Sequence, residues 1–130
     1  MMVISYEGIE FVKIQYGDVV LAFNPVSRNS VFKGGKFGAD IVCVSLDHPD
    51  TNGVESVIFG EKIPFVISGP GEYELKGISI RGFVSESAYD KEKRINTVYL
   101  ATVEGMHICF LGALGSILNK ETDEAIEGID

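Results

Sequence analysis

Two acids and a histidine stand together in a short polar segment that follows an apolar run. Asp47, His48 and Asp50 come directly after Val44-Ser45-Leu46 and before a Thr-Asn-Gly sequence. Imidazole and carboxylate groups bind divalent metals and transfer protons, and binding sites of open α/β sheets gather at the carboxyl ends of strands. These three residues therefore suggest a metal or acid–base site. The alternative is an ordinary loop in which Asp50 caps a following helix.

The remaining histidine and the two cysteines fit structural roles. His107 lies in the apolar run 106–111, where side-chain alternation places it opposite Ile108 and Phe110, as in a surface or half-buried strand residue. Cys43 and Cys109 each lie inside an apolar run and form no C-x-x-C motif. We expect two reduced, buried thiols, with a redox or catalytic thiol as the alternative.

The elements that must position these groups are mostly strands. Alternating or apolar runs at 3–6, 9–14 and 19–23 predict a meander of hairpins, and the continuous apolar run 40–46 predicts a central parallel strand covered by helices. Further strands are expected at 65–67, in a hairpin around Lys76-Gly77, and at 97–103 and 107–111. Short helices are expected at 53–59 and in the tail, the latter capped by Asn119 or Thr122. The fold class is β-rich α/β, with about ten strands and one or two helices.

Length and charge limit the possible partners. The 130 residues are expected to form a single domain spanning 1–130, and the 45% apolar content can supply its core. Nineteen acids against eleven bases give a net charge of −8, which argues against nucleic-acid partners. Neither a spanning apolar run nor a secretory signal is evident in the sequence, so no membrane partner is expected. We therefore expect a cytoplasmic protein.

Several segments, in order, resemble the metallo-β-lactamase superfamily. Residues 46–51 resemble its H-x-H-x-D-H metal loop, and residues 22–25 resemble its D-P loop with Asn24 in place of the acid. Further matching segments are GADIV at 38–42, GPGEYE at 69–74, KGISI at 76–80 and LGALG at 111–115. The pattern is similar to small bacterial and archaeal hydrolases that include the ascorbate-phosphate lactonases. The resemblance implies the N-terminal part of an αββα sandwich, shortened relative to a family member.

The resemblance also implies that most of the family's metal ligands are missing. Leu46 and Thr51 stand where the metal loop has its first and last histidines. The later histidine would fall near Tyr89, and Ala113 replaces the bridging aspartate. Two ligand positions are retained, His48 and Asp50, and they would belong to different metals. Because a zinc site needs three protein ligands and a water, we expect vestigial metal positions, no catalytic residue and no cofactor.

These observations predict a degenerate metallo-β-lactamase-fold domain that serves as a binding or assembly module and not as an enzyme, with an unidentified small-molecule ligand. The alternative is a divergent zinc-dependent hydrolase of lactone or phosphoester substrates. Its site would be built from Asp47, His48 and Asp50 or shared between subunits. A purely structural domain is the third possibility.

The sequence further predicts a homodimer. Four strands offer more apolar residues than one or two short helices could cover, and monomers rarely expose large apolar patches. These strands are 41–44, 65–67, 98–101 and 108–111.

Overall fold

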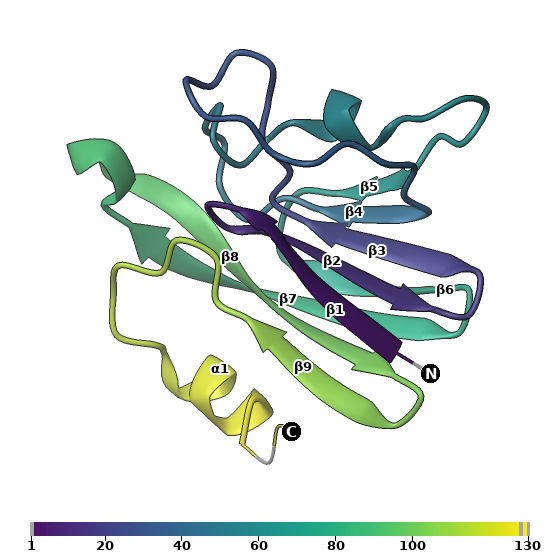
Figure 1. Cartoon of the computed structure of the whole chain (residues 1–130). Helices are drawn as coiled ribbons and strands as arrows, with labels where there is room; N and C mark the ends of the chain where they lie inside the picture. Colours follow the sequence, from purple (N-terminus) through teal and green to yellow (C-terminus); the bar gives the residue numbers. More distant parts are fainter. Residues whose placement is uncertain (1, 128, 130) are drawn as a thin grey trace. The chain divides into compact units, whose positions relative to one another are not determined.

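The computed structural model describes residues 2–127 and 129. The chain divides into two compact units, one within residues 1–68 and one within residues 69–130, and each contains one β-sheet (Figure 1). The two units are described separately below.

The first unit is a five-stranded mixed sheet with the strand order β1-β2-β3-β4-β5. Its strands are β1 (Met2–Gly8), β2 (Phe11–Tyr16), β3 (Val19–Phe23), β4 (Ile41–Cys43) and β5 (Phe65–Ile67). The first three form an antiparallel meander, whereas β4 lies between β3 and β5 and runs parallel to both (Figure 1). The predicted meander and the predicted central parallel strand are both confirmed.

The strand β4 is shorter than the predicted run 40–46. Val44, Ser45 and Leu46 are buried, but the backbone ladder to β3 ends at Cys43. At that point Asn24 takes a left-handed conformation (φ 48°), and its side chain accepts a hydrogen bond from the Ser45 backbone N–H. A side chain therefore replaces the next backbone partner and ends the strand.

A loop and a single 3₁₀ turn, not a longer helix, cover one face of this sheet. Phe11 of β2 and Val42 of β4 pack in a buried cluster with Val57, which lies in the turn η1 (Val54–Val57). The predicted helix at 53–59 was wrong: η1 has no side-chain cap, and Ile58 already returns to an extended conformation. The prediction that helices cover the central strand is also wrong, because the cover that packs on Val42 comes from a loop and from this four-residue turn.

The second unit is a four-stranded antiparallel sheet with the order β6-β7-β8-β9. Its strands are β6 (Gly71–Leu75), β7 (Ile78–Ser87), β8 (Arg94–Val103) and β9 (Met106–Phe110). The hairpin β6–β7 turns at Lys76-Gly77 and the hairpin β8–β9 at Glu104-Gly105, and all four turn residues have positive φ. Two such central residues define the turn that matches strand twist, with glycine second. The predicted hairpins are confirmed.

The tail helix α1 (Lys120–Ala125) covers part of one face of the second sheet. The Asn119 side chain accepts a hydrogen bond from the Thr122 N–H (2.8 Å), so Asn119 is the N-cap. Ala125 packs against the buried cluster formed by Phe83, Val98 and Leu100. Of the two predicted caps, Asn119 is therefore correct.

Residues 2–127 contain nine strands, the helix α1 and two 3₁₀ turns, η1 and η2 (Tyr89–Lys91). The predicted β-rich class is confirmed, with one strand fewer than expected. Among the described residues, no helix combines the length and apolarity required to cross a membrane. The prediction of a single domain over 1–130 stays a prediction.

Candidate functional site

Asn24 joins the carboxyl ends of β3 and β4. This fully buried side chain accepts a hydrogen bond from the Ser45 N–H (2.8 Å) and donates to Ser45 Oγ (2.7 Å) and Glu10 Oε1 (3.3 Å). Its backbone N–H donates to the Cys43 carbonyl (2.9 Å). An amide provides both a donor and an acceptor, whereas an ionised carboxylate only accepts. Asparagine therefore fits this position as a structural bridge.

Glu10 comes from the turn between β1 and β2 and lies half-buried beside this bridge. Burial raises the pKa of its carboxyl above the ordinary value, the hydrogen bond from Asn24 lowers it, and the negative charge of Asp50 raises it. The negative charge of Asp50 therefore acts on the Glu10 carboxyl, although the two residues are far apart in the sequence.

The segment that resembles a metal loop is closed by its own hydrogen bonds. Thr51 is fully buried, and its hydroxyl donates to the Leu46 carbonyl (2.7 Å). The backbone N–H groups of Thr51 and Asn52 both donate to the His48 carbonyl (2.9 Å each). The Asn52 side chain donates to Asp47 Oδ1 (2.8 Å). The two substituted positions, 46 and 51, are thus bonded to each other.

His48 and Asp50 are buried, and they contact each other within the same loop. The Asp50 N–H donates to His48 Nδ1 (3.0 Å), and this nitrogen lies 3.6 Å from Asp50 Oδ2. Asp50 Oδ1 accepts a hydrogen bond from Ser30 Oγ (2.5 Å), which belongs to the loop between β3 and β4. Asp50 therefore connects two loops at the carboxyl edge of the first sheet.

These residues do not fit a zinc site. The Leu46 side chain offers no ligating atom, the Thr51 hydroxyl donates a hydrogen bond to a carbonyl, and His48 Nδ1 accepts a hydrogen bond from the Asp50 backbone N–H. Zinc requires about three protein ligands arranged around it. Among the described residues, no group of three or more His, Cys, Asp or Glu side chains is placed to hold a metal ion.

In the second unit, the positions that correspond to family ligands hold residues with structural contacts. The Ala113 N–H donates to Asn96 Oδ1 (3.0 Å), and Asn96 Nδ2 donates to the Leu111 carbonyl and to Ser85 Oγ (2.9 Å each). Tyr89 lies in η2, where its N–H donates to Ser87 Oγ (3.1 Å). Fully buried Asn96 thus holds the turn after β9, a role that no sequence motif indicated.

The other candidate residues have the environments expected of structural groups. His107 is exposed on β9, and its Nδ1 lies 3.0 Å from Thr102 Oγ1, which confirms a surface strand position. Both cysteines are free thiols; the predicted burial is confirmed for Cys43 in β4 and wrong for Cys109, which is only half-buried because it lies on the edge strand β9. Burial raises the pKa of both thiols, which disfavours the nucleophilic thiolate.

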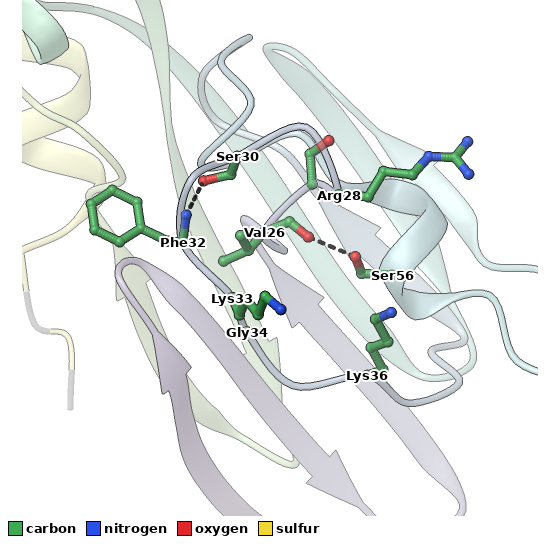
Figure 2. Close-up of a pocket in the computed structure, with 9 residues that line it drawn as sticks. Val26, Arg28, Ser30, Phe32, Lys33, Gly34, Lys36 and Ser56 are labelled. Carbon is green, nitrogen blue, oxygen red and sulfur yellow. Dashed lines mark hydrogen bonds between the residues drawn. The ribbon is translucent and has the colours of Figure 1, made fainter.

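A pocket of about 320 Å³ opens beside this loop edge in the first unit (Figure 2). Three bases contribute to its lining: Arg28, Lys33 and Lys36. Three serines, two apolar residues and one glycine complete it: Ser27, Ser30, Ser56, Val26, Phe32 and Gly34. The Ser56 hydroxyl donates to the Val26 carbonyl (2.6 Å), and the Phe32 N–H donates to Ser30 Oγ (3.0 Å), as drawn in Figure 2. Because the bases are spread over nine positions of an irregular loop, no spacing motif pointed to this pocket.

Solved structures similar to this chain include proteins described as metal-dependent hydrolases and a diiron β-hydroxylase. A protein assigned as a Zn-dependent hydrolase of the metallo-β-lactamase superfamily from Thermotoga maritima is 26% identical, with a TM-score of 0.73, over 100% of this chain and 59% of that one. A metallo hydrolase from the archaeon Ignicoccus hospitalis is 17% identical, with a TM-score of 0.64, over 98% and 66% of the two chains. A diiron β-hydroxylase from Streptomyces venezuelae is 13% identical, with a TM-score of 0.69, over 99% and 33%.

The chain thus spans less than two thirds of the length of these proteins. No curated protein matches the sequence at a significant level. The sequence model of the family described as the Beta-lactamase superfamily domain matches residues 3–130, which include both units. The strand arrangement, the matching segments and this family match agree, and the chain belongs to the metallo-β-lactamase superfamily.

Proposed function

We propose that this domain has the metallo-β-lactamase fold without its catalytic metal site and that it binds a small molecule. The observation that carries the proposal is the hydrogen bond from Thr51 Oγ to the Leu46 carbonyl (2.7 Å). It joins the two positions at which the family loop has histidines, and it uses the only polar side-chain group that either position offers. A metal bound here would have to break that bond and would gain no ligand from Leu46.

The retained residues His48 and Asp50 support the same proposal. Each takes part in a hydrogen bond that stabilises the loop: the Asp50 N–H donates to His48, and Ser30 donates to the Asp50 carboxylate. Buried polar groups with such partners stabilise a fold in their own right. Their presence is explained without a metal.

A second candidate function is a divergent metal-dependent hydrolase. His48 Nδ1 lies 3.6 Å from Asp50 Oδ2, so two ligand types remain adjacent, and the similar Thermotoga maritima protein is assigned as Zn-dependent. A further ligand from a second subunit could complete such a site, as in the shared-site alternative raised by the sequence.

Zinc content separates the two candidates. Protein prepared without chelator and equilibrated with excess zinc should retain far less than one zinc per chain after dialysis, measured by mass spectrometry. The matched variants His48→Ala and Asp50→Asn should retain the same amount, because neither residue holds metal in the proposal. Stoichiometric zinc that is lost in both variants would contradict the proposal and favour the hydrolase.

Activity provides an independent test. Lactone, phosphodiester and β-lactam substrates should not be hydrolysed above background, with or without added zinc, because no group activates water. Turnover that disappears in His48→Ala but persists in His107→Ala would establish the hydrolase instead.

The partner predictions also stay proposals. A net charge of −8 should disfavour nucleic acids and anionic membranes, since both are negatively charged. For the homodimer, the supporting surface is smaller than the sequence suggested, because residues 41–44 and 98–101 are buried within the single chain. Of the two predicted dimer strands in the first unit, only 65–67 keeps exposed apolar side chains: Phe65 and Val66 on the edge strand β5 are about half exposed (50% and 45%).

A further inference from the structure

The pocket beside β3 is positively charged in a protein that is strongly acidic. Residues 19–39 contain Arg28, Lys33 and Lys36 and no acid, although the chain has nineteen acids in 130 residues. All three bases line the pocket. In Figure 2, Lys33 and Lys36 lie below Val26, while the guanidinium of Arg28 extends outward from the upper rim. The positive charge of this segment therefore favours binding of an anion, although the net charge of the whole chain is negative.

The three bases have no ion-pair partner among residues 2–127 and 129. Two nearby acids are engaged in hydrogen bonds: Glu55 Oε1 accepts from Ser27 Oγ (3.0 Å) and the Arg28 N–H (3.4 Å), and Asp50 accepts from Ser30. A third acid, Glu7, places its carboxylate against Gly35, between Lys33 and Lys36 in the sequence, so it reduces the positive charge there without forming an ion pair with either lysine. The charges of the bases are thus available to a ligand.

The walls of the pocket are held by backbone hydrogen bonds. The Ser27 N–H donates to the Pro49 carbonyl (2.9 Å), the Phe37 N–H to the Ser56 carbonyl (3.4 Å) and the Gly35 N–H to the Glu7 carbonyl (3.4 Å). At Gly34 a Cβ atom would lie 2.9 Å from the Phe11 ring and 3.0 Å from Val26, so only glycine fits the packing. The pocket is therefore a built part of the unit, which reduces the ordering cost of binding.

The pocket also offers apolar contact. Val26 is almost fully buried, and Phe32, whose ring points away from Val26 in Figure 2, is half exposed (50%). A volume of about 320 Å³ is at the lower end of the range of small-molecule sites. An anion that carries a small apolar group would place its charge at the bases and its apolar group at this part of the lining.

We propose that this pocket binds a small organic phosphate monoester, with the phosphate at Lys33 and Lys36 and the organic group against Val26 and Phe32. A doubly charged phosphate suits two or three lysine and arginine groups. The inference rests on the proposed binding function and gives it a ligand class. Ser30 places this pocket next to Asp50, so the remnant of the metal loop would hold one wall of a binding site.

The test uses the whole chain and three probes: phenyl phosphate, inorganic phosphate and phenol. Titration followed by backbone amide chemical shifts should place phenyl phosphate at residues 26–36 and 56, with a dissociation constant of about 1 mM or lower. Inorganic phosphate should bind at the same amides more weakly, and phenol should not bind. Lys33→Gln and Lys36→Gln should each weaken phenyl phosphate by about tenfold.

A matched double variant, Lys93→Gln with Lys120→Gln, removes two exposed positive charges from the second unit and should leave affinity unchanged. Equal losses in this control and in the pocket variants would indicate nonspecific charge attraction and overturn the inference. So would the absence of shifts at about 10 mM phenyl phosphate, or binding of phenol as strong as that of phenyl phosphate. Thermal unfolding of each variant verifies that it is folded.

Failure of this inference differs from failure of the proposed function. If no probe binds and no zinc is retained, the phosphate ligand is wrong but the absence of a metal site stands. If zinc is retained stoichiometrically through His48 and Asp50, the proposed function is wrong whatever the pocket binds.

Discussion

Replacing Asn24 by aspartate should destabilise the protein, even though the family has an acid at this position. The side chain is fully buried and donates to both Ser45 Oγ and Glu10 Oε1. An ionised carboxylate in its place would keep the bond from the Ser45 N–H, and the Ser45 hydroxyl could turn to donate to it. Glu10 has no such option, because its carboxylate only accepts.

The magnitude follows from the contact with Glu10. The atoms now joined by a hydrogen bond are 3.3 Å apart, and an isosteric carboxylate would place two acceptor oxygens at that separation. A lost buried donor costs about 1–3 kcal/mol, and an uncompensated buried charge adds to it. We expect Asn24→Asp to lower the free energy of unfolding by about 2–4 kcal/mol at pH 7.

The loss should depend on pH with a defined sign. Burial already raises the pKa of Glu10 above its ordinary value, so the folded state binds this proton more tightly than the unfolded state does. Stability contributed by the proton is present at low pH and is lost as pH rises through the folded pKa. A second carboxylate would extend this loss to higher pH. The defect of Asn24→Asp should therefore shrink markedly near pH 4.

Urea unfolding at pH 7 and pH 4, followed by circular dichroism, measures these differences. The control Asn29→Asp makes the same charge change at an exposed site and should cost about 0.5 kcal/mol or less. Adding Glu10→Gln to Asn24→Asp should restore most of the stability, because a glutamine amide can donate to the new carboxylate. Full stability of Asn24→Asp at pH 7, or failure of Glu10→Gln to rescue it, would refute the reasoning.

Three other predictions follow from packing and burial. Gly53→Ala should destabilise the first unit by about 2–3 kcal/mol in the same urea assay, because the new Cβ would lie 2.4 Å from backbone atoms of Val26 and Ser27. The control Gly69→Ala should be nearly neutral, because a Cβ at that position would meet no atom within 4 Å. In the folded protein Cys109 should react with a thiol reagent slowly and Cys43 only after unfolding, as mass spectrometry can assign; rapid reaction of Cys43 would contradict its burial. Sedimentation at micromolar concentration should give twice the 14.1 kDa chain mass and Phe65→Lys should lower it, whereas a clean monomer would exclude the predicted homodimer.

Local chemistry made much of the strand order predictable. The turns at Lys76-Gly77 and Glu104-Gly105 each contain a glycine beside a residue in positive φ, and turns of this kind are encoded by adjacent residues. The unbroken apolar run around Val42 likewise indicated a strand buried between neighbours. The predicted helix at 53–59 failed because a distant contact decides its geometry: Gly53 lies against the backbone of Val26 and Ser27.

The hydrogen-bond networks were beyond prediction because their members are far apart in the sequence. Asn24 bonds to Ser45 and to Glu10, and Asn96 bonds to the turn at Leu111. A polar residue near a strand has many conceivable partners, and only the assembled sheet decides which one lies within reach. The resemblance to the family marked position 24 as altered, but it did not reveal that the amide would bridge two strands.

Retention of a metal-ligand type of residue is weak evidence for a metal when the residue has a second structural use. Asp50 receives the Ser30 hydroxyl and its N–H donates to His48, so its loss would free one wall of the pocket and one turn of the loop. Leu46 has no comparable side-chain role in hydrogen bonding, and Thr51 supplies its own bond to the Leu46 carbonyl. Hydrogen bonds within and beside the loop therefore give His48, Asp50 and Thr51 a structural role that needs no metal, which is the physical basis of the proposed function.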